Sequence, residues 1–146
     1  VLALDMSKAA LAVILAMWLG SSPGVTTICA LSVLVGHIWP IFIGFKGGRG
    51  TASGWAALFV LSPISGVVAT MVALPLILIT RYVSVGSIVG ATVGGLTIAV
   101  LAFSGHTETH YAWFGFIGTS LILLRHTENM KRLIKGEERK LGNRET

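Results

Sequence analysis

The chain has 146 residues, of which 53% are hydrophobic and 12% charged, whereas a soluble domain averages about 25% charged residues. This composition excludes an ordinary soluble domain and predicts an all-α, polytopic integral membrane protein built as a helical bundle. Its net charge of +5 fits cytoplasmic loops in contact with anionic lipid rather than a nucleic-acid partner, and the single cysteine, Cys29, excludes a disulfide within the chain.

Six apolar segments follow one another and are predicted to be membrane-spanning helices. They are residues 9–20, 25–45, 51–61, 64–80, 84–103 and 111–124. Residues 25–45 are long enough to cross a ~30 Å hydrocarbon core at about 1.5 Å per residue. Segment 51–61 is about 16 Å long and too short to cross unaided. We expect it to thin the bilayer locally or to enter as a partial helix shielded by its neighbours.

The distribution of Lys and Arg decides whether residues 50–80 form one helix or two. With a break at Ser62-Pro63 the chain crosses six times, and all eleven Lys and Arg residues fall on one side. With one helix instead, Arg81 falls outside and the C-terminal tail lies opposite Lys46. Because cytoplasmic loops are enriched in Lys and Arg, the sequence predicts two helices. The whole chain, 1–146, is then one membrane-embedded domain with a cytoplasmic basic tail at 125–146.

A glycine-rich, cationic stretch between the second and third segments is the first candidate site. It reads Lys46-Gly47-Gly48-Arg49-Gly50-Thr51. Glycines let backbone N–H groups face a ligand, and a nest of such groups beside Lys and Arg is a good receptor for phosphate. A helix beginning at Thr51 would add its positive dipole end. An ordinary cytoplasmic loop explains the local chemistry equally well.

The second polar constellation lies at the start of the tail. If residues 126–136 are helical, His126, Asn129 and Leu133 share one face, with Arg132 and Gly136 beside it. Arg, Asn and His together suit an anionic, hydroxylated ligand. A juxtamembrane helix lying on anionic lipid is the alternative. The predicted topology puts this segment on the side of Lys46 and Arg49, so the two stretches are expected to form one pocket.

Two further patterns are interpreted as structural. Gly86, Gly90 and Gly94 recur every four residues and make a flat helix face for close packing. His106 and His110 flank Glu108 in an outer loop, but a third ligand is missing nearby, so no metal site is predicted.

The two polar stretches resemble a known family. Gly36-His37-x-x-Pro40-x-Phe42-x-x-Phe45-Lys46-Gly47-Gly48-Arg49-Gly50 is similar to the second signature of the bacterial acyl-phosphate:glycerol-3-phosphate acyltransferases, the PlsY family. His126-x-x-Asn129-x-x-Arg132-Leu133-x-x-Gly136-x-Glu138 resembles the third signature, and Asp5-x-x-Lys8 is also similar to the family. The motifs occur in the expected order and the resemblance covers nearly the whole chain.

Departures from the family pattern are few. They are Trp39, Arg49, Thr51, Ser53 and Met130, where the family usually has Phe, Lys, Val, Thr and Ile. Arg49 keeps the charge, but Arg and Lys are not interchangeable where geometry matters. The family's first signature, Ser-Gly-Asn-x-Gly-Ala-Thr-Asn followed by an Arg, is not in this chain. We therefore expect an upstream segment holding that signature and a seventh span.

The resemblance implies acyl transfer from acyl phosphate to the 1-hydroxyl of glycerol 3-phosphate, without a cofactor or metal. It also implies a bacterial inner-membrane enzyme with its active site facing the cytoplasm, working on both substrates at the lipid bilayer. The oligomeric state stays open. A transporter or channel for small phosphorylated anions is the alternative function, but the predicted spans hold no charged residue at mid-depth.

The same resemblance implies roles for the residues. Gly47, Gly48, Gly50 and Thr51 cradle the acyl-phosphate head with backbone N–H groups, and Lys46 and Arg49 neutralise phosphate. His126 and Asn129 are catalytic and hold glycerol phosphate, and the further substrate-binding residues are His37, Arg132 and Glu138. The general base is left open between His126, His37 and a substrate phosphate oxygen.

Overall fold

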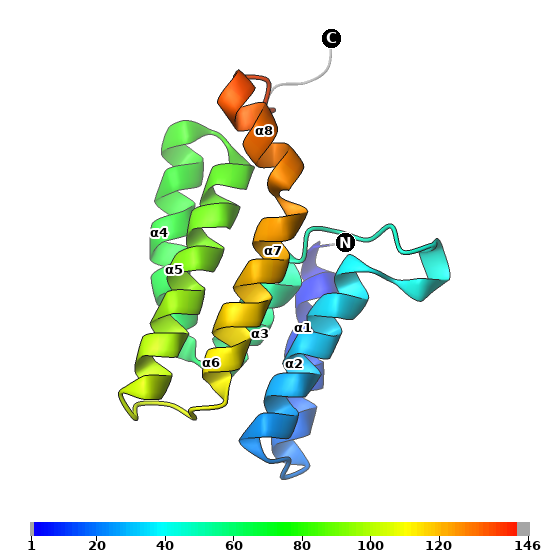
Figure 1. Ribbon diagram of the computed structural model, residues 1–146, viewed down its shortest axis with the longest axis vertical. Helices are drawn as coiled ribbons and strands as arrows, with labels where there is room; N and C mark the ends of the chain where they lie inside the picture. The colour runs from blue at the N-terminus through cyan, green and yellow to red at the C-terminus, as the bar shows by residue number, and fades with distance from the viewer. Residues whose placement is uncertain (1, 143–146) are drawn as a thin grey trace.

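The structure is a computed structural model that describes residues 2–142, and within that range it contains helices and no strand (Figure 1). The helices are α1 (Leu2–Trp18), α2 (Pro23–Ile38), α3 (Thr51–Leu61), α4 (Pro63–Thr80), α5 (Val83–Phe103), α6 (Tyr111–Trp113), α7 (Thr119–Arg125) and α8 (Thr127–Lys135). A 3₁₀ turn, η1 (Ile41–Ile43), follows α2, and a π-helical turn, η2 (Phe114–Gly118), joins α6 to α7. The all-α prediction is confirmed.

The helices form two groups with a central element between them (Figure 1). One group is the hairpin of α4 and α5, and the other is formed by α1 and α2, with α3 packed against α1. The continuous helix made by α6, η2 and α7 runs between the groups and contacts α5 and α2. Helix α8 continues from the end of α7 beyond the bundle. This arrangement brings the end of α7 to the same end of the bundle as the N-terminus.

The predicted break at Ser62-Pro63 is confirmed. Helix α3 ends at Leu61, and the Ser62 hydroxyl accepts a hydrogen bond from the N–H of Ser65 at 3.4 Å. Pro63 occupies the first position of α4, where a missing N–H costs nothing. A serine cap followed by proline is a strong start signal for a helix, so α3 ends and α4 begins at this point.

Two predicted boundaries were wrong. The first helix begins at Leu2 rather than residue 9, so Asp5 and Lys8 lie inside it, where they form an i,i+3 ion pair at 2.7 Å. The second helix ends at Ile38 rather than residue 45. Pro40 excludes helical backbone at Trp39, which adopts φ −126° and ψ 68° instead. Residues 39–50 are therefore outside the helix, apart from the short turn η1.

Membrane crossing has partial support in helix length. Helices α4 and α5 are long and apolar enough to span a bilayer, whereas α2, α3 and Tyr111–Arg125 are shorter apolar helices. The predicted count of six crossings therefore remains a prediction.

The small-residue face of α5 packs as predicted. A Cβ added to Gly90 would lie 2.7 Å from the Ala73 Cβ, and one added to Gly94 would lie 2.9 Å from the Ala69 Cβ. On another side of α5, a Cβ on Gly115 would lie 2.5 Å from the Gly95 carbonyl oxygen. Glycines thus let α5 touch both α4 and η2 closely, which holds the two groups of helices together.

Candidate active site

The glycine-rich loop folds back onto the end of α2. The N–H of Gly47 donates to the Ile38 carbonyl at 3.2 Å, and the N–H of Gly48 donates to the His37 carbonyl at 3.3 Å. These bonds satisfy carbonyl groups that a helix leaves unpaired at its C-terminus. A Cβ on Gly47 would overlap the His37 carbonyl and the Pro40 ring. The predicted N–H cradle is therefore reduced, because two of its members bind the protein itself.

Helix α3 starts immediately after this loop. Gly50 is its N-cap, with φ +81°, and a Cβ there would lie 2.8 Å from a Leu34 methyl group. The N–H groups of residues 51–53 have no partner within the helix, as in any first turn, and they carry the positive end of the helix dipole. Arg49 is exposed next to them. This helix start has the geometry to accept an anion at Gly50 and Thr51.

His126 lies at the junction of α7 and α8 and is 1% exposed. Its Nδ1 lies 2.8 Å from the Ile122 carbonyl. Because a carbonyl oxygen only accepts, Nδ1 carries the proton, and the neutral ring leaves its Nε2 lone pair free. Burial lowers the pKa of His126, with Arg49 and Arg125 acting in the same direction against the Ile122 bond and Glu138. The ring is therefore neutral near pH 7 and its Nε2 can take a proton.

Asn129 and Arg132 on α8 form a second network with Glu138, which follows the end of that helix. The Asn129 amide donates to Glu138 Oε1 at 2.6 Å, and Arg132 Nε donates to Glu138 Oε2 at 2.8 Å. Burial raises the pKa of Glu138, but these hydrogen bonds outweigh it and the pKa lies below its usual value. Since both carboxylate oxygens have protein partners, Glu138 orients Asn129 and Arg132.

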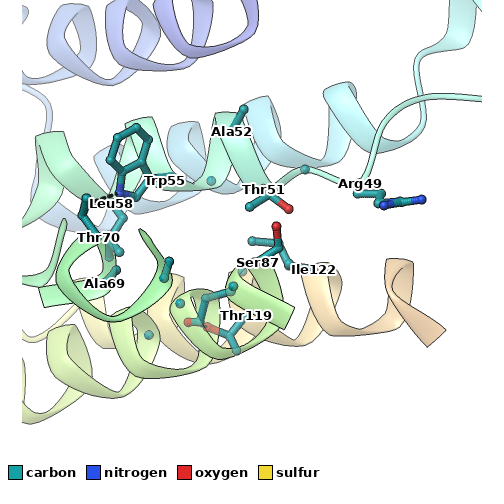
Figure 2. A pocket seen from close by; sticks show the side chains of 18 of the residues that line it. Arg49, Thr51, Ala52, Trp55, Leu58, Ala69, Thr70, Ser87, Thr119 and Ile122 are labelled. Carbon is teal, nitrogen blue, oxygen red and sulfur yellow. Dashed lines mark hydrogen bonds between the residues drawn. The ribbon is translucent and has the colours of Figure 1, made fainter. Parts of the chain in front are cut away.

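One cavity of about 610 Å³ runs from the α3 start into the bundle. Its polar end is lined by His37, Arg49, Gly50, Thr51 and His126, and its interior by apolar side chains of α3, α4, α5 and η2. Figure 2 shows Arg49 at one end, Trp55 and Leu58 at the other, and Thr51, Ser87 and Thr119 between them. A cavity with a cationic mouth and an apolar interior suits an amphiphile with an anionic head.

The predicted site residues fall into two sets. His37, Arg49, Gly50, Thr51 and His126 share the cavity wall. The others are not part of that wall: Lys46 is exposed on the loop, Gly47 and Gly48 bond to α2, and Asn129 and Arg132 of α8 bind Glu138. The two polar stretches therefore meet at one end of the bundle. This agrees with the prediction that both lie on the same side of the membrane.

Three polar residues at this end were not found from the sequence. Arg125 donates to the Gly47 carbonyl at 3.4 Å, and among residues 2–142 its buried Nε has no hydrogen-bond partner. The buried Ser84 hydroxyl lies beside Glu138 and helps to lower the pKa of that carboxyl group, and Ser87 lines the cavity. The position of Arg125 directly before His126 could have signalled it. The serines could not be told apart from the small residues that pack around them.

Metal-ligating side chains do not gather in the described residues: no group of three His, Cys, Asp or Glu is found there. His106 and His110 are exposed, and His106 Nδ1 lies 3.0 Å from the Ser104 hydroxyl.

Comparisons with known proteins point to one family. A family model described as Glycerol-3-phosphate acyltransferase matches residues 1–136. A glycerol-3-phosphate acyltransferase of Desulforamulus reducens is 39% identical over 146 residues, covering 100% of this chain and 71% of the relative. One from Neisseria gonorrhoeae is 38% identical over 144 residues, covering 96% and 70%.

Solved structures agree with these sequence relatives. The crystal structure of PlsY, an integral membrane glycerol 3-phosphate acyltransferase, in its glycerol 3-phosphate form has a TM-score of 0.85 at 32% identity. The match covers 97% of this chain and 69% of that one. The lysophosphatidic acid form of PlsY gives the same score and identity, with 70% of its chain covered.

Proposed function

The chain belongs to the glycerol-3-phosphate acyltransferase family, and we propose that it moves a fatty acyl group from acyl phosphate to the 1-hydroxyl of glycerol 3-phosphate. The products are lysophosphatidic acid and inorganic phosphate. The observation that carries the proposal is the cavity. An anion site with Arg49, a free imidazole nitrogen of His126 and an apolar region all border it. These are the groups that an amphiphilic phosphate donor and a hydroxyl acceptor require.

The donor head fits the start of α3. Arg49 and the free N–H groups after Gly50 would neutralise the phosphate, and Lys46 adds charge from the loop. The acyl chain would enter the apolar part of the cavity toward Trp55 and Leu58. Binding a head group and a chain at opposite ends fixes the reactive carbonyl between them, close to His126.

The acceptor fits the groups on α8. Asn129 and Arg132, oriented by Glu138, would hold the phosphate and hydroxyls of glycerol 3-phosphate. His126 Nε2 then takes the proton of the 1-hydroxyl as its oxygen attacks the acyl carbon. The bond between that carbon and the phosphate oxygen breaks, and the phosphate leaves with the electron pair. Arg49 and the α3 N–H groups stabilise the charge on the departing phosphate.

We also propose that residues 1–146 form one domain in the bacterial inner membrane, crossing it six times, with residues 125–146 and the active site facing the cytoplasm. Contacts of Arg81 support this side assignment. Its guanidinium donates to the Leu141 carbonyl at 2.9 Å, and its own carbonyl accepts from the Leu141 N–H at 2.6 Å. The turn between α4 and α5 therefore lies beside the tail, as a common membrane face requires.

Reconstituted liposomes test the proposed function. With the upstream segment that the sequence predicts supplied, we expect lysophosphatidic acid and phosphate to form from palmitoyl phosphate and glycerol 3-phosphate, and not from palmitoyl-CoA. His126→Ala should reduce the rate about 100-fold or more, because a general base contributes roughly 10²–10⁴. The exposed His106 provides the matched control, and His106→Ala should leave the rate unchanged. Uptake of glycerol 3-phosphate without ester formation would instead indicate a transporter.

A further inference from the structure

An ion pair on α1 lies against the end of α2. Lys8 Nζ is 2.7 Å from Asp5 Oδ1 and 3.0 Å from His37 Nδ1, and Asp5 Oδ1 is 3.4 Å from the same nitrogen. The side chains of His37 and Asp5 are only 13% and 19% exposed. Two charged groups of α1 therefore meet at one imidazole nitrogen of α2, beside the cavity that His37 lines.

The contact with Lys8 determines where the His37 proton lies. An ammonium group has donors and no acceptor, so the 3.0 Å contact with Lys8 favours an accepting His37 Nδ1 over one that donates to Asp5 at 3.4 Å. A neutral ring whose Nδ1 accepts carries its proton on Nε2. A proton on Nδ1 would face the Lys8 cation, while Asp5 balances the charge of Lys8 and keeps the ammonium in place.

The proton on Nε2 faces the glycine-rich loop. A Cβ at Gly48 would overlap the His37 Nε2, so only a glycine lets the ring lie this close to the loop. Among residues 2–142, Nε2 forms no hydrogen bond, and the ring lines the same cavity as Arg49 and His126. His126 shows the opposite arrangement, with Nδ1 donating to Ile122 and Nε2 free to accept. The two rings thus offer a donor and an acceptor to one cavity.

We propose that Lys8 and Asp5 are positioning residues that hold His37 as the neutral Nε2–H tautomer, and that this N–H donates to an oxygen of the departing phosphate. The inference rests on the proposed function for the identity of that anion. It assigns the two histidines different roles: His126 accepts the proton, and His37 only donates a hydrogen bond. Removing one such preorganised donor lowers kcat by roughly 10²–10³.

Nitrogen-15 NMR of histidine-labelled protein in nanodiscs reads the tautomer directly. The His37 signals, identified by their loss in His37→Gln, should show an unprotonated Nδ1 and a protonated Nε2. In Lys8→Met, Asp5 becomes the remaining partner and Nδ1 should become protonated. Lys131→Met is the matched control, because Lys131 forms the same i,i+3 pair at 2.7 Å, with Glu128 on α8, and it should leave the His37 signals unchanged.

Two substitutions at position 37 test the donor itself. The Gln side-chain amide reaches the place of Nε2, and that of Asn reaches the place of Nδ1. His37→Gln should keep kcat within about tenfold, whereas His37→Asn should lose about 100-fold. Lys8→Met should lower kcat without raising KM for glycerol 3-phosphate, and Lys8→Arg should restore it.

The outcomes separate this inference from the proposed function. Without acyl-phosphate turnover by any variant or by the wild type, the proposed function fails, whatever the tautomer. With turnover, equal rates for His37→Gln and His37→Asn would overturn the inference. A protonated Nδ1 in the wild type would overturn it as well, and that measurement needs no variant of Lys8 to fold.

Discussion

Gly47→Ala tests whether the glycine-rich loop works through packing or by presenting its N–H groups to phosphate. The new Cβ would lie 2.6 Å from the Ile38 carbonyl oxygen and 2.5 Å from the Pro40 Cδ, so the backbone must move. Overpacking of this kind costs about 1–3 kcal/mol, and loss of the N–H bond to Ile38 adds about 1 kcal/mol. We expect a total of about 2–4 kcal/mol, which lowers the apparent melting temperature by roughly 5–15 °C.

Donor affinity should fall together with stability, because the displaced loop also carries Arg49. Gly36→Ala is the matched control. Gly36 lies within α2, a Cβ there meets nothing within 4 Å, and alanine is favoured over glycine inside a helix by about 1 kcal/mol. Thermal unfolding in detergent and KM for palmitoyl phosphate are measured for both variants. A Gly47→Ala protein that melts like the wild type but binds the donor poorly would refute the packing argument and restore the N–H cradle.

Three further predictions follow from the same contacts. Because burial and nearby cations lower the pKa of His126, kcat/KM should fall on the acid side with a midpoint below the ordinary histidine pKa of about 6.5. Arg125→Met should move this midpoint upward, and a downward shift would contradict the role of His126 as the proton acceptor. Glu138→Gln should lower activity about 10-fold or more, because an amide cannot accept both hydrogen bonds and a charge-assisted bond is worth about 1.5–3 kcal/mol. The neighbouring Glu137 is exposed, so Glu137→Gln should behave like the wild type, and an equal loss of activity in both variants would count against the network. In a background without the single cysteine, Arg81→Cys should be labelled only from the cytoplasm, and labelling from outside would exclude six crossings.

The helices could be predicted from the sequence where apolar periodicity and caps agree. The break at Ser62-Pro63 was found from charge distribution and proline, and the structure confirms it. The ends of α1 and α2 were missed for opposite reasons. Charged residues suggested that the first helix starts later, although Asp5 and Lys8 pair on its surface, and apolar residues after Pro40 concealed the end of the second.

The site was predictable as a set of residue types but not as a set of contacts. The sequence indicated that residues 46–51 and 126–138 meet, because both carry charges of one membrane face. It did not indicate that Gly47 and Gly48 give their N–H groups to α2, since a glycine pair looks the same whether it packs or binds a ligand. The proton positions on His37 and His126 depend on Lys8 and Ile122, which only the folded chain brings near.

Substrate kinetics of His126→Ala test the central claim most directly, that a free imidazole nitrogen and a separate anion site share one cavity. Rates at saturating palmitoyl phosphate and glycerol 3-phosphate are compared with the wild type, together with KM for each substrate. The account predicts a loss of at least about 100-fold in kcat with KM for palmitoyl phosphate nearly unchanged, because Arg49 and the start of α3 bind the donor independently. A variant that keeps kcat but loses donor affinity would contradict it, since His126 would then bind phosphate rather than accept the proton.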